Sequence, residues 1–202
     1  MDLAVILVTF GAIFLVELPD KTFIAALVLS TRYRPLLVWI GVGLAFFVQT
    51  LVAVAAGKLA TFLPDTLIQG VSAVIFVLGA IVLIRTAPRA DAEERAQERE
   101  YAAKATDPKT GLKAVAASFL VLFAAEWGDL SQLLTISMVA RFDDHVSVFL
   151  GAWGALLTVS GLAVLSGRLL LRHVRLSVLH YLGGTVCLIL AAVTLYELLV
   201  VS

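Results

Sequence analysis

Hydrophobic residues form long uninterrupted runs in this sequence, and short polar or charged joints separate the runs. About 20 consecutive, mostly apolar residues are enough for one α-helix to cross a membrane. By this criterion the pattern predicts an all-α polytopic membrane protein with six transmembrane helices. We expect them at residues 3–30, 36–57, 66–85, 112–140, 146–170 and 176–201.

The composition agrees with this prediction. Hydrophobic residues make up 61% of the 202 residues, charged residues make up 15%, and the mean hydropathy is +1.01. Soluble proteins contain about 45–50% apolar and about 25% charged residues. Fifteen basic and fifteen acidic residues cancel, so the net charge gives no reason to expect a nucleic-acid partner. A single cysteine, Cys187, excludes an intramolecular disulfide and a cysteine-based zinc cluster.

One stretch differs in kind from the six runs. Residues 86–111 are rich in interspersed acidic and basic side chains, which is typical of a solvent-exposed helix. We expect a charged helical linker that acts as a tether, with a regulatory role as the alternative. It would join two three-helix repeats, residues 1–85 and residues 112–202.

The two predicted repeats resemble each other. A Glu-x-x-Asp-x-Thr/Ser motif in the first run recurs 109 positions later in the fourth run, and weaker echoes follow at similar spacing. An odd number of spans per repeat places the two copies in opposite orientations, so the pattern predicts a 3+3 inverted repeat. In secondary transporters built this way, the substrate binds near the middle of the membrane, between the repeats.

Basic residues in the joints predict the orientation, because cytoplasmic loops carry an excess of Lys and Arg. One side of the predicted bundle has only Lys58 and Arg141. The other side has Arg32 and Arg34, seven basic residues between positions 85 and 113, and Arg168, Arg172 and Arg175. We therefore expect a cytoplasmic linker and two extracytoplasmic termini. The N-terminus lacks the positively charged stretch of a signal peptide, and the short loops indicate a bacterial plasma membrane.

Four carboxylates lie inside predicted spans: Glu17, Asp20, Glu126 and Asp129. Residues three positions apart are neighbours on a helix, so each pair is expected on one helical face. A carboxylate at bilayer depth costs about 2.5–3.5 kcal/mol. Four together cost on the order of 10 kcal/mol, comparable with the whole stability of a typical domain, about 5–15 kcal/mol. Since Lys21 is one cation against four acids, the pattern favours four carboxylates that converge on a cation from outside the protein.

Neighbouring side chains narrow the kind of cation. Thr22, Ser131 and Gln132 offer further oxygen atoms, and Gln49 is either a ligand or a hydrogen bond between helices. None of the three histidines lies near an acidic motif in the sequence. An all-oxygen site suits Mg²⁺, Ca²⁺ or Mn²⁺ rather than zinc or copper.

Pro19 and Gly128 each stand between the Glu and the Asp of a motif. Both residue types weaken helices, so we expect local unwinding that frees backbone carbonyl groups as further ligands. Lys21 is either a tethered counter-ion that fills the empty site or a structural partner of Asp20. Trp127, inside the second motif, is expected in the cavity wall.

Crowding of the four carboxylates also predicts a link to protons. Like charges and desolvation both disfavour ionisation, so some protons are expected to remain on the empty site near neutral pH. A divalent cation would displace them, and this competition would couple metal and proton movement through one set of groups.

At these residues the sequence resembles the Gdt-type manganese/calcium transporters, which include MneA-type bacterial manganese exporters and Golgi-resident eukaryotic members. The resemblance rests on two copies of Glu-x-Gly-Asp-Lys/Arg-Thr/Ser in a six-helix protein with a charged central loop, and it covers nearly the whole chain. Pro19 and Leu130 depart from the motif, since the first copy usually has Gly and the second usually has Arg or Lys. Because Leu130 replaces a basic residue of the usual motif, the site is more negative by one charge.

The resemblance implies divalent cation transport in exchange for protons. We expect Mn²⁺ export, with Ca²⁺ as the alternative cargo and no permanent cofactor. By the same resemblance the metal ligands would be the four acids, supported by Thr22, Ser131 and Gln132.

Other functions fit the motifs less well. An intramembrane aspartyl protease needs two lone Asp residues, and a lipid-phosphate hydrolase would need Arg near the acids, which both motifs lack. An amino-acid exporter of related architecture is a closer alternative, but its site should offer a positive group for the substrate carboxylate. We therefore expect a transporter rather than an enzyme.

Overall fold

The computed structural model describes residues 1–18, 20–104, 110–173 and 176–200, and every element in these ranges is a helix. The first half contains α1 (Leu3–Glu17), α2 (Lys21–Arg32), α3 (Pro35–Ala60) and α4 (Asp65–Thr86). A short 3₁₀ helix, η1 (Ala87–Arg89), leads into α5 (Ala90–Lys104). The second half contains α6 (Leu112–Ala125), α7 (Leu130–Phe142), α8 (His145–His173) and α9 (Leu176–Val200). These bounds follow the predicted apolar runs closely.

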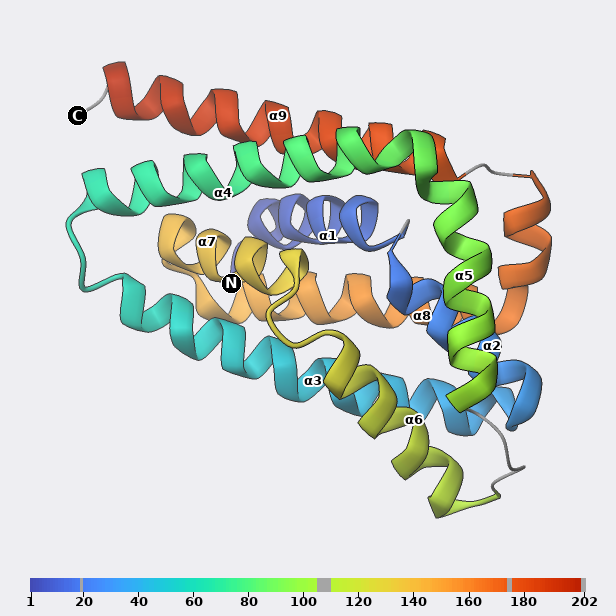
Figure 1. The fold of residues 1–202 in the computed structure, drawn as a ribbon. Coiled ribbons are helices and arrows are strands. Elements are labelled where there is room, and N and C mark those ends of the chain that lie inside the picture. Colours follow the sequence, from blue (N-terminus) through green and yellow to red (C-terminus); the bar gives the residue numbers. More distant parts are fainter. Residues whose placement is uncertain (19, 105–109, 174–175, 201–202) are drawn as a thin grey trace.

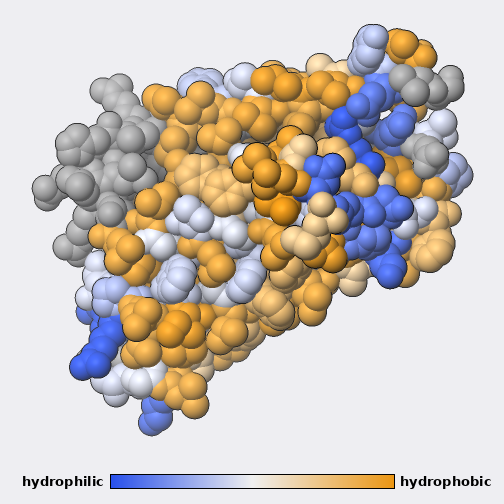
Figure 2. Space-filling view, turned by 180° about the vertical axis from the view of Figure 1, so that it is seen from behind, coloured by the Kyte–Doolittle hydropathy of each residue, from blue (hydrophilic) through white to orange (hydrophobic). Residues whose placement is uncertain are grey.

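The helices account for four to six membrane spans. On their own, α3, α4, α8 and α9 are long and apolar enough to cross a membrane. The pairs α1 with α2 and α6 with α7 pass the same test only together, because they are bent by 70° and 74° at short breaks. Counting each bent pair as one span gives the six that the sequence predicts. Figure 2 shows a mostly hydrophobic surface on one face, with hydrophilic residues gathered toward the ends.

The two halves run in opposite directions, as an inverted repeat requires (Figure 1). α1 leads from the end that holds the N-terminus toward the end covered by α5, whereas α6 and α7 lead back the other way. Equivalent helix pairs are in contact: α1 packs on α8 as α6 packs on α3, and α2 packs on α8 as α7 packs on α3. This reciprocal packing places the two breaks, and the acidic motifs within them, in the middle of the bundle.

Two glycines at equivalent positions let the halves approach closely. A Cβ atom at Gly41 would lie 2.4 Å from the carbonyl oxygen of Val115, and one at Gly151 would lie 2.7 Å from the carbonyl oxygen of Ile6. Small residues at helix crossings in membranes permit such close backbone approach. The crossings α3–α6 and α1–α8, which hold the two bent pairs in place, therefore depend on the absence of a side chain at these positions.

The predicted linker is helical over α5, but it is more than a tether. α5 lies across one end of the bundle and contacts α2 and α9 (Figure 1). Tyr101 is only 6% exposed and belongs to the hydrophobic core, and Ala90 is also buried. Residues 105–109 of the linker lie outside the described ranges.

Candidate cation site

Both acidic motifs lie at the breaks between paired helices. Glu17 is the last residue of α1 and Asp20 directly precedes α2, while Glu126 directly follows α6 and Asp129 directly precedes α7. The expectation that each pair shares one helical face is therefore wrong, because the helix ends inside each motif. The two acids of a motif approach each other across a turn instead.

The expected unwinding is confirmed in the second motif. Gly128 has a φ of +81°, a left-handed conformation that glycine adopts without the steric cost of a Cβ atom. The Gly128 backbone N–H donates a hydrogen bond to Oε1 of Gln132, 3.0 Å away, so this side chain stabilises the break. Pro19 lies outside the described residues.

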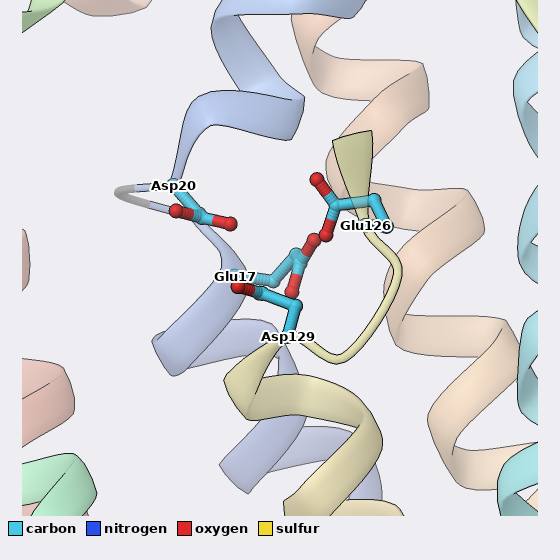
Figure 3. A group of neighbouring side chains, drawn as sticks. All are labelled: Glu17, Asp20, Glu126 and Asp129. Atoms are coloured by element: carbon cyan, nitrogen blue, oxygen red, sulfur yellow. The ribbon is translucent and has the colours of Figure 1, made fainter. Parts of the chain in front are cut away.

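The two breaks bring the four predicted carboxylates together (Figure 3). One oxygen atom from each of Glu17, Asp20, Glu126 and Asp129 lies within 4.8 Å of the others. Glu17 is fully buried and Glu126 is 2% exposed, while Asp20 and Asp129 are partly buried. Both carboxylate oxygens of Glu17 and one each of Asp20 and Glu126 are buried without a hydrogen-bond partner among the described residues. Buried polar atoms are nearly always paired, so this arrangement is suited to a positively charged ligand.

Contacts between the motifs cross from one half to the other. Nζ of Lys21 lies 2.9 Å from Oδ1 of Asp129, and the Thr22 hydroxyl donates a hydrogen bond to Oε1 of Glu126. In the other direction, Ser131 lies beside Glu17. The 2.9 Å ion pair of Lys21 is thus formed with the second motif. Each half thus supplies polar side chains that contact the acids of the other half.

The contacts of Gln49 and Trp127 show what each side chain does in the structure. Nε2 of Gln49 donates a hydrogen bond to the carbonyl oxygen of Phe123, 2.9 Å away, so Gln49 links α3 to the end of α6. Trp127 is 62% exposed and packs against the Phe123 ring, with 5.1 Å between ring centroids. The expectation that Trp127 forms the cavity wall is wrong.

A cavity of about 170 Å³ adjoins the acids on the side of α5. Asp20, Lys21 and Asp129 line it, and residues of α4, α5 and α9 complete it. One of these is His180, so a histidine lies close to the motifs in space although it is remote in the sequence. The volume is enough for several water molecules. The two Asp residues thus face the cavity, and the two Glu residues lie deeper.

A separate and much smaller cavity lies beside α7. Gln49, Ser131 and Gln132 line a cavity of only about 10 Å³, together with Thr50 and Thr135. A water molecule needs roughly this much space. Of these two cavities, the larger one is lined by the two Asp residues and lies on the side of α5.

Comparison with known proteins identifies the family. The family model described as divalent cation/proton antiporter GDT1 matches residues 5–91 and 114–201, one segment in each half. The chain belongs to the GDT1 family. This confirms the resemblance inferred from the motifs, and the division of the match supports the internal repeat. A GDT1 protein is a membrane transporter that exchanges divalent cations for protons and is not an enzyme.

Several GDT1 relatives align along most of the chain. It is 30% identical over 186 residues to GDT1-like protein sll0615 of Synechocystis, which covers 88% of this chain and 90% of that protein. It is 29% identical over 207 residues to Protein PAM71, chloroplastic, of Arabidopsis thaliana, with 94% of this chain but 56% of that protein aligned. GDT1-like protein C17G8.08c of Schizosaccharomyces pombe is 27% identical over 229 residues, or 92% and 79% of the two chains. No solved structure matches.

Proposed function

We propose that this GDT1 protein exports Mn²⁺ in exchange for protons, with Ca²⁺ as the alternative cargo. In this proposal the cation is held by Glu17, Asp20, Glu126 and Asp129. The supporting observation is that one oxygen from each lies within 4.8 Å of the others. Opposite ligands of one ion are separated by twice the metal–oxygen distance, about 4.0–4.2 Å for Mg²⁺ and about 4.6–5.2 Å for Ca²⁺. The four oxygens can therefore contact a single ion with little movement.

The other predicted residues support the acids in different ways. The hydroxyls of Thr22 and Ser131 lie against Glu126 and Glu17 and orient these carboxylates toward the ion. Gln132 steadies the Gly128 break, and Gln49 holds α3 against α6. The Lys21 ammonium group is the internal cation that the arriving ion displaces from Asp129.

Proton exchange follows from the same four groups. Four carboxylates this close cannot all be ionised without a cation among them, because their charges repel and they are shielded from water. In the absence of metal, protons and Lys21 reduce the negative charge. A divalent ion entering from one side displaces protons, and protons from the other side later displace the ion.

The direction of transport rests on the orientation of the bundle. α5 and the basic joint after α2 lie at one end, and the N-terminus and the end of α9 lie at the other (Figure 1). With α5 in the cytoplasm of a bacterium, the 170 Å³ cavity lies on the cytoplasmic side of the acids and both termini are extracytoplasmic. A cation would then reach the acids from the cytoplasm, as export requires.

Transport in reconstituted vesicles tests the proposal. Wild-type protein should move Mn²⁺, and more slowly Ca²⁺, with an opposite proton flux that a pH-sensitive dye reports. Glu126→Gln should abolish both fluxes without preventing insertion, while Glu98→Gln, on the linker helix away from the cavity, should leave them unchanged. Cation movement without proton movement would contradict the exchange. Faster Ca²⁺ than Mn²⁺ movement would make Ca²⁺ the cargo, and movement of an amino acid instead would overturn the proposed site.

A further inference from the structure

The linker helix α5 presents one face to the cation cavity. Glu93, Gln97 and Tyr101 are spaced four residues apart, which places them along one side of the helix. Glu93 and Gln97 line the same cavity as Asp20 and Asp129. A segment predicted from its charge to be a tether therefore contributes directly to the walls around the acids.

Gln97 has an unsatisfied oxygen at this position. Its Oε1 atom is buried and has no hydrogen-bond partner among the described residues. An amide oxygen that is buried without a partner costs free energy, and a cation or its water shell in the adjoining cavity would satisfy it. A side-chain carbonyl is a suitable ligand for a hard divalent cation.

Tyr101 anchors the same face of α5 against the site. Its ring belongs to the hydrophobic core, and α5 contacts α2, which begins directly after Asp20. Burial raises the pKa of the Tyr101 hydroxyl to about 12, and the negative charge of Glu126 adds to this shift. The contact fixes the register of α5 so that Gln97 and Glu93 face the cavity.

We infer that the face of α5 formed by Glu93 and Gln97 is part of the cation pathway and helps to select the ion. The two side chains supply oxygen ligands as the ion loses water on its way to Asp20 and Asp129. This inference rests on the proposed function, because it assigns a route to the same transported ion. The alternative is that α5 only braces the bundle.

Transport kinetics distinguish the two roles. Gln97→Leu, which keeps the volume and removes the oxygen, should raise KM for Mn²⁺ about tenfold, which corresponds to about 1.4 kcal/mol. The ratio of Mn²⁺ to Ca²⁺ rates should also change, while Gln97→Glu should keep KM near or below the wild-type value. Glu93→Gln should raise KM, and Glu98→Gln is the matched control on the same helix. If α5 is only a brace, Gln97→Leu would lower the melting temperature or the yield and leave KM and selectivity unchanged, which would overturn the inference.

Thiol labelling provides a readout that does not depend on transport. In a Cys187→Ala background, which removes the one native cysteine, Gln97→Cys and Glu98→Cys each offer one target. Mn²⁺ should slow labelling at position 97 and leave labelling at position 98 unchanged. Equal rates with and without Mn²⁺ at both positions would contradict the inference. If wild-type vesicles move no Mn²⁺ or Ca²⁺, the proposed function itself fails; if they do and the α5 variants behave as wild type, only this inference fails.

Discussion

Nζ of Lys21 lies 2.9 Å from Oδ1 of Asp129, so the one lysine in a transmembrane motif neutralises an acid of the other repeat. Thr22 crosses in the same way to Glu126. The site is thus assembled from both halves, and neither break contains a complete set of acids with their partners. Local changes in one repeat should therefore alter cation binding by the whole site.

Removal of the internal cation should strengthen metal binding. Lys21→Gln deletes the ammonium group that competes with the ion for Asp129. The ion pair is 20–30% exposed at its side chains, so we expect a modest effect, a decrease in KM for Mn²⁺ of about three- to tenfold. Lys58→Gln, at the exposed end of α3, is the control. An unchanged or increased KM in the Lys21 variant would show that the ammonium group does not compete with the ion.

Loss of the Thr22 hydroxyl should weaken binding. Thr22→Val keeps the shape of the side chain and removes its hydrogen bond to Glu126. Hydrogen bonds to charged groups contribute about 1.5–3 kcal/mol, so KM should rise by roughly one to two orders of magnitude. Thr22→Ser should retain most of the affinity. Equal KM values for the Val and Ser variants, measured in the same vesicles, would exclude a role for this hydroxyl.

The crossing pattern also predicts what a second lysine would do. Leu130 occupies the position equivalent to Lys21 and lines the cavity with Asp20. Leu130→Lys should place an ammonium group beside Asp20, which would compete with the ion and raise KM for Mn²⁺ about tenfold. Leu130→Met, similar in size and uncharged, is the control. A Lys variant with the same KM as the Met variant would contradict the structural equivalence of positions 21 and 130.

Added methyl groups at the two close crossings should destabilise the fold. Gly41→Ala and Gly151→Ala would each bring a Cβ atom within 2.7 Å of a backbone oxygen, and overpacking of this kind costs about 1–3 kcal/mol. Gly70→Ala on α4 meets nothing within 4 Å and should be neutral or slightly stabilising. Thermal unfolding in detergent should show lower melting temperatures for the first two variants only. Three equal melting temperatures would show that the crossings can relax at no cost.

Much of the fold was predictable from the sequence. Long apolar runs define membrane helices because backbone groups in lipid must be satisfied within the helix, and the helix bounds agree with the runs. The four acids were conspicuous for the same reason, since charges in such runs are costly. The break in the second motif was also foreseeable from Gly128, because glycine weakens a helix and readily adopts the positive φ found there.

Features that depend on packing between distant segments were not predictable. The sharing of a helical face was a wrong expectation because it assumed a continuous helix through each motif, whereas α1 and α6 end there. His180 and Gln97 reach the cavity from α9 and α5, and nothing in their local sequence indicates this. A weak signal was present in Tyr101 and Ala90, since residues that pack into a core are unexpected in a freely solvated linker.

Equilibrium binding of Mn²⁺ to the purified protein tests the central claim most directly. If the acids of both repeats hold one shared ion, the wild-type chain should bind a single Mn²⁺ at this site, and either Glu17→Gln or Glu126→Gln should weaken binding by at least about tenfold. The double variant should be little worse than either single variant, because the site is already lost. Two bound ions per chain, one of which survives neutralisation of the opposite motif with unchanged affinity, would contradict a shared site.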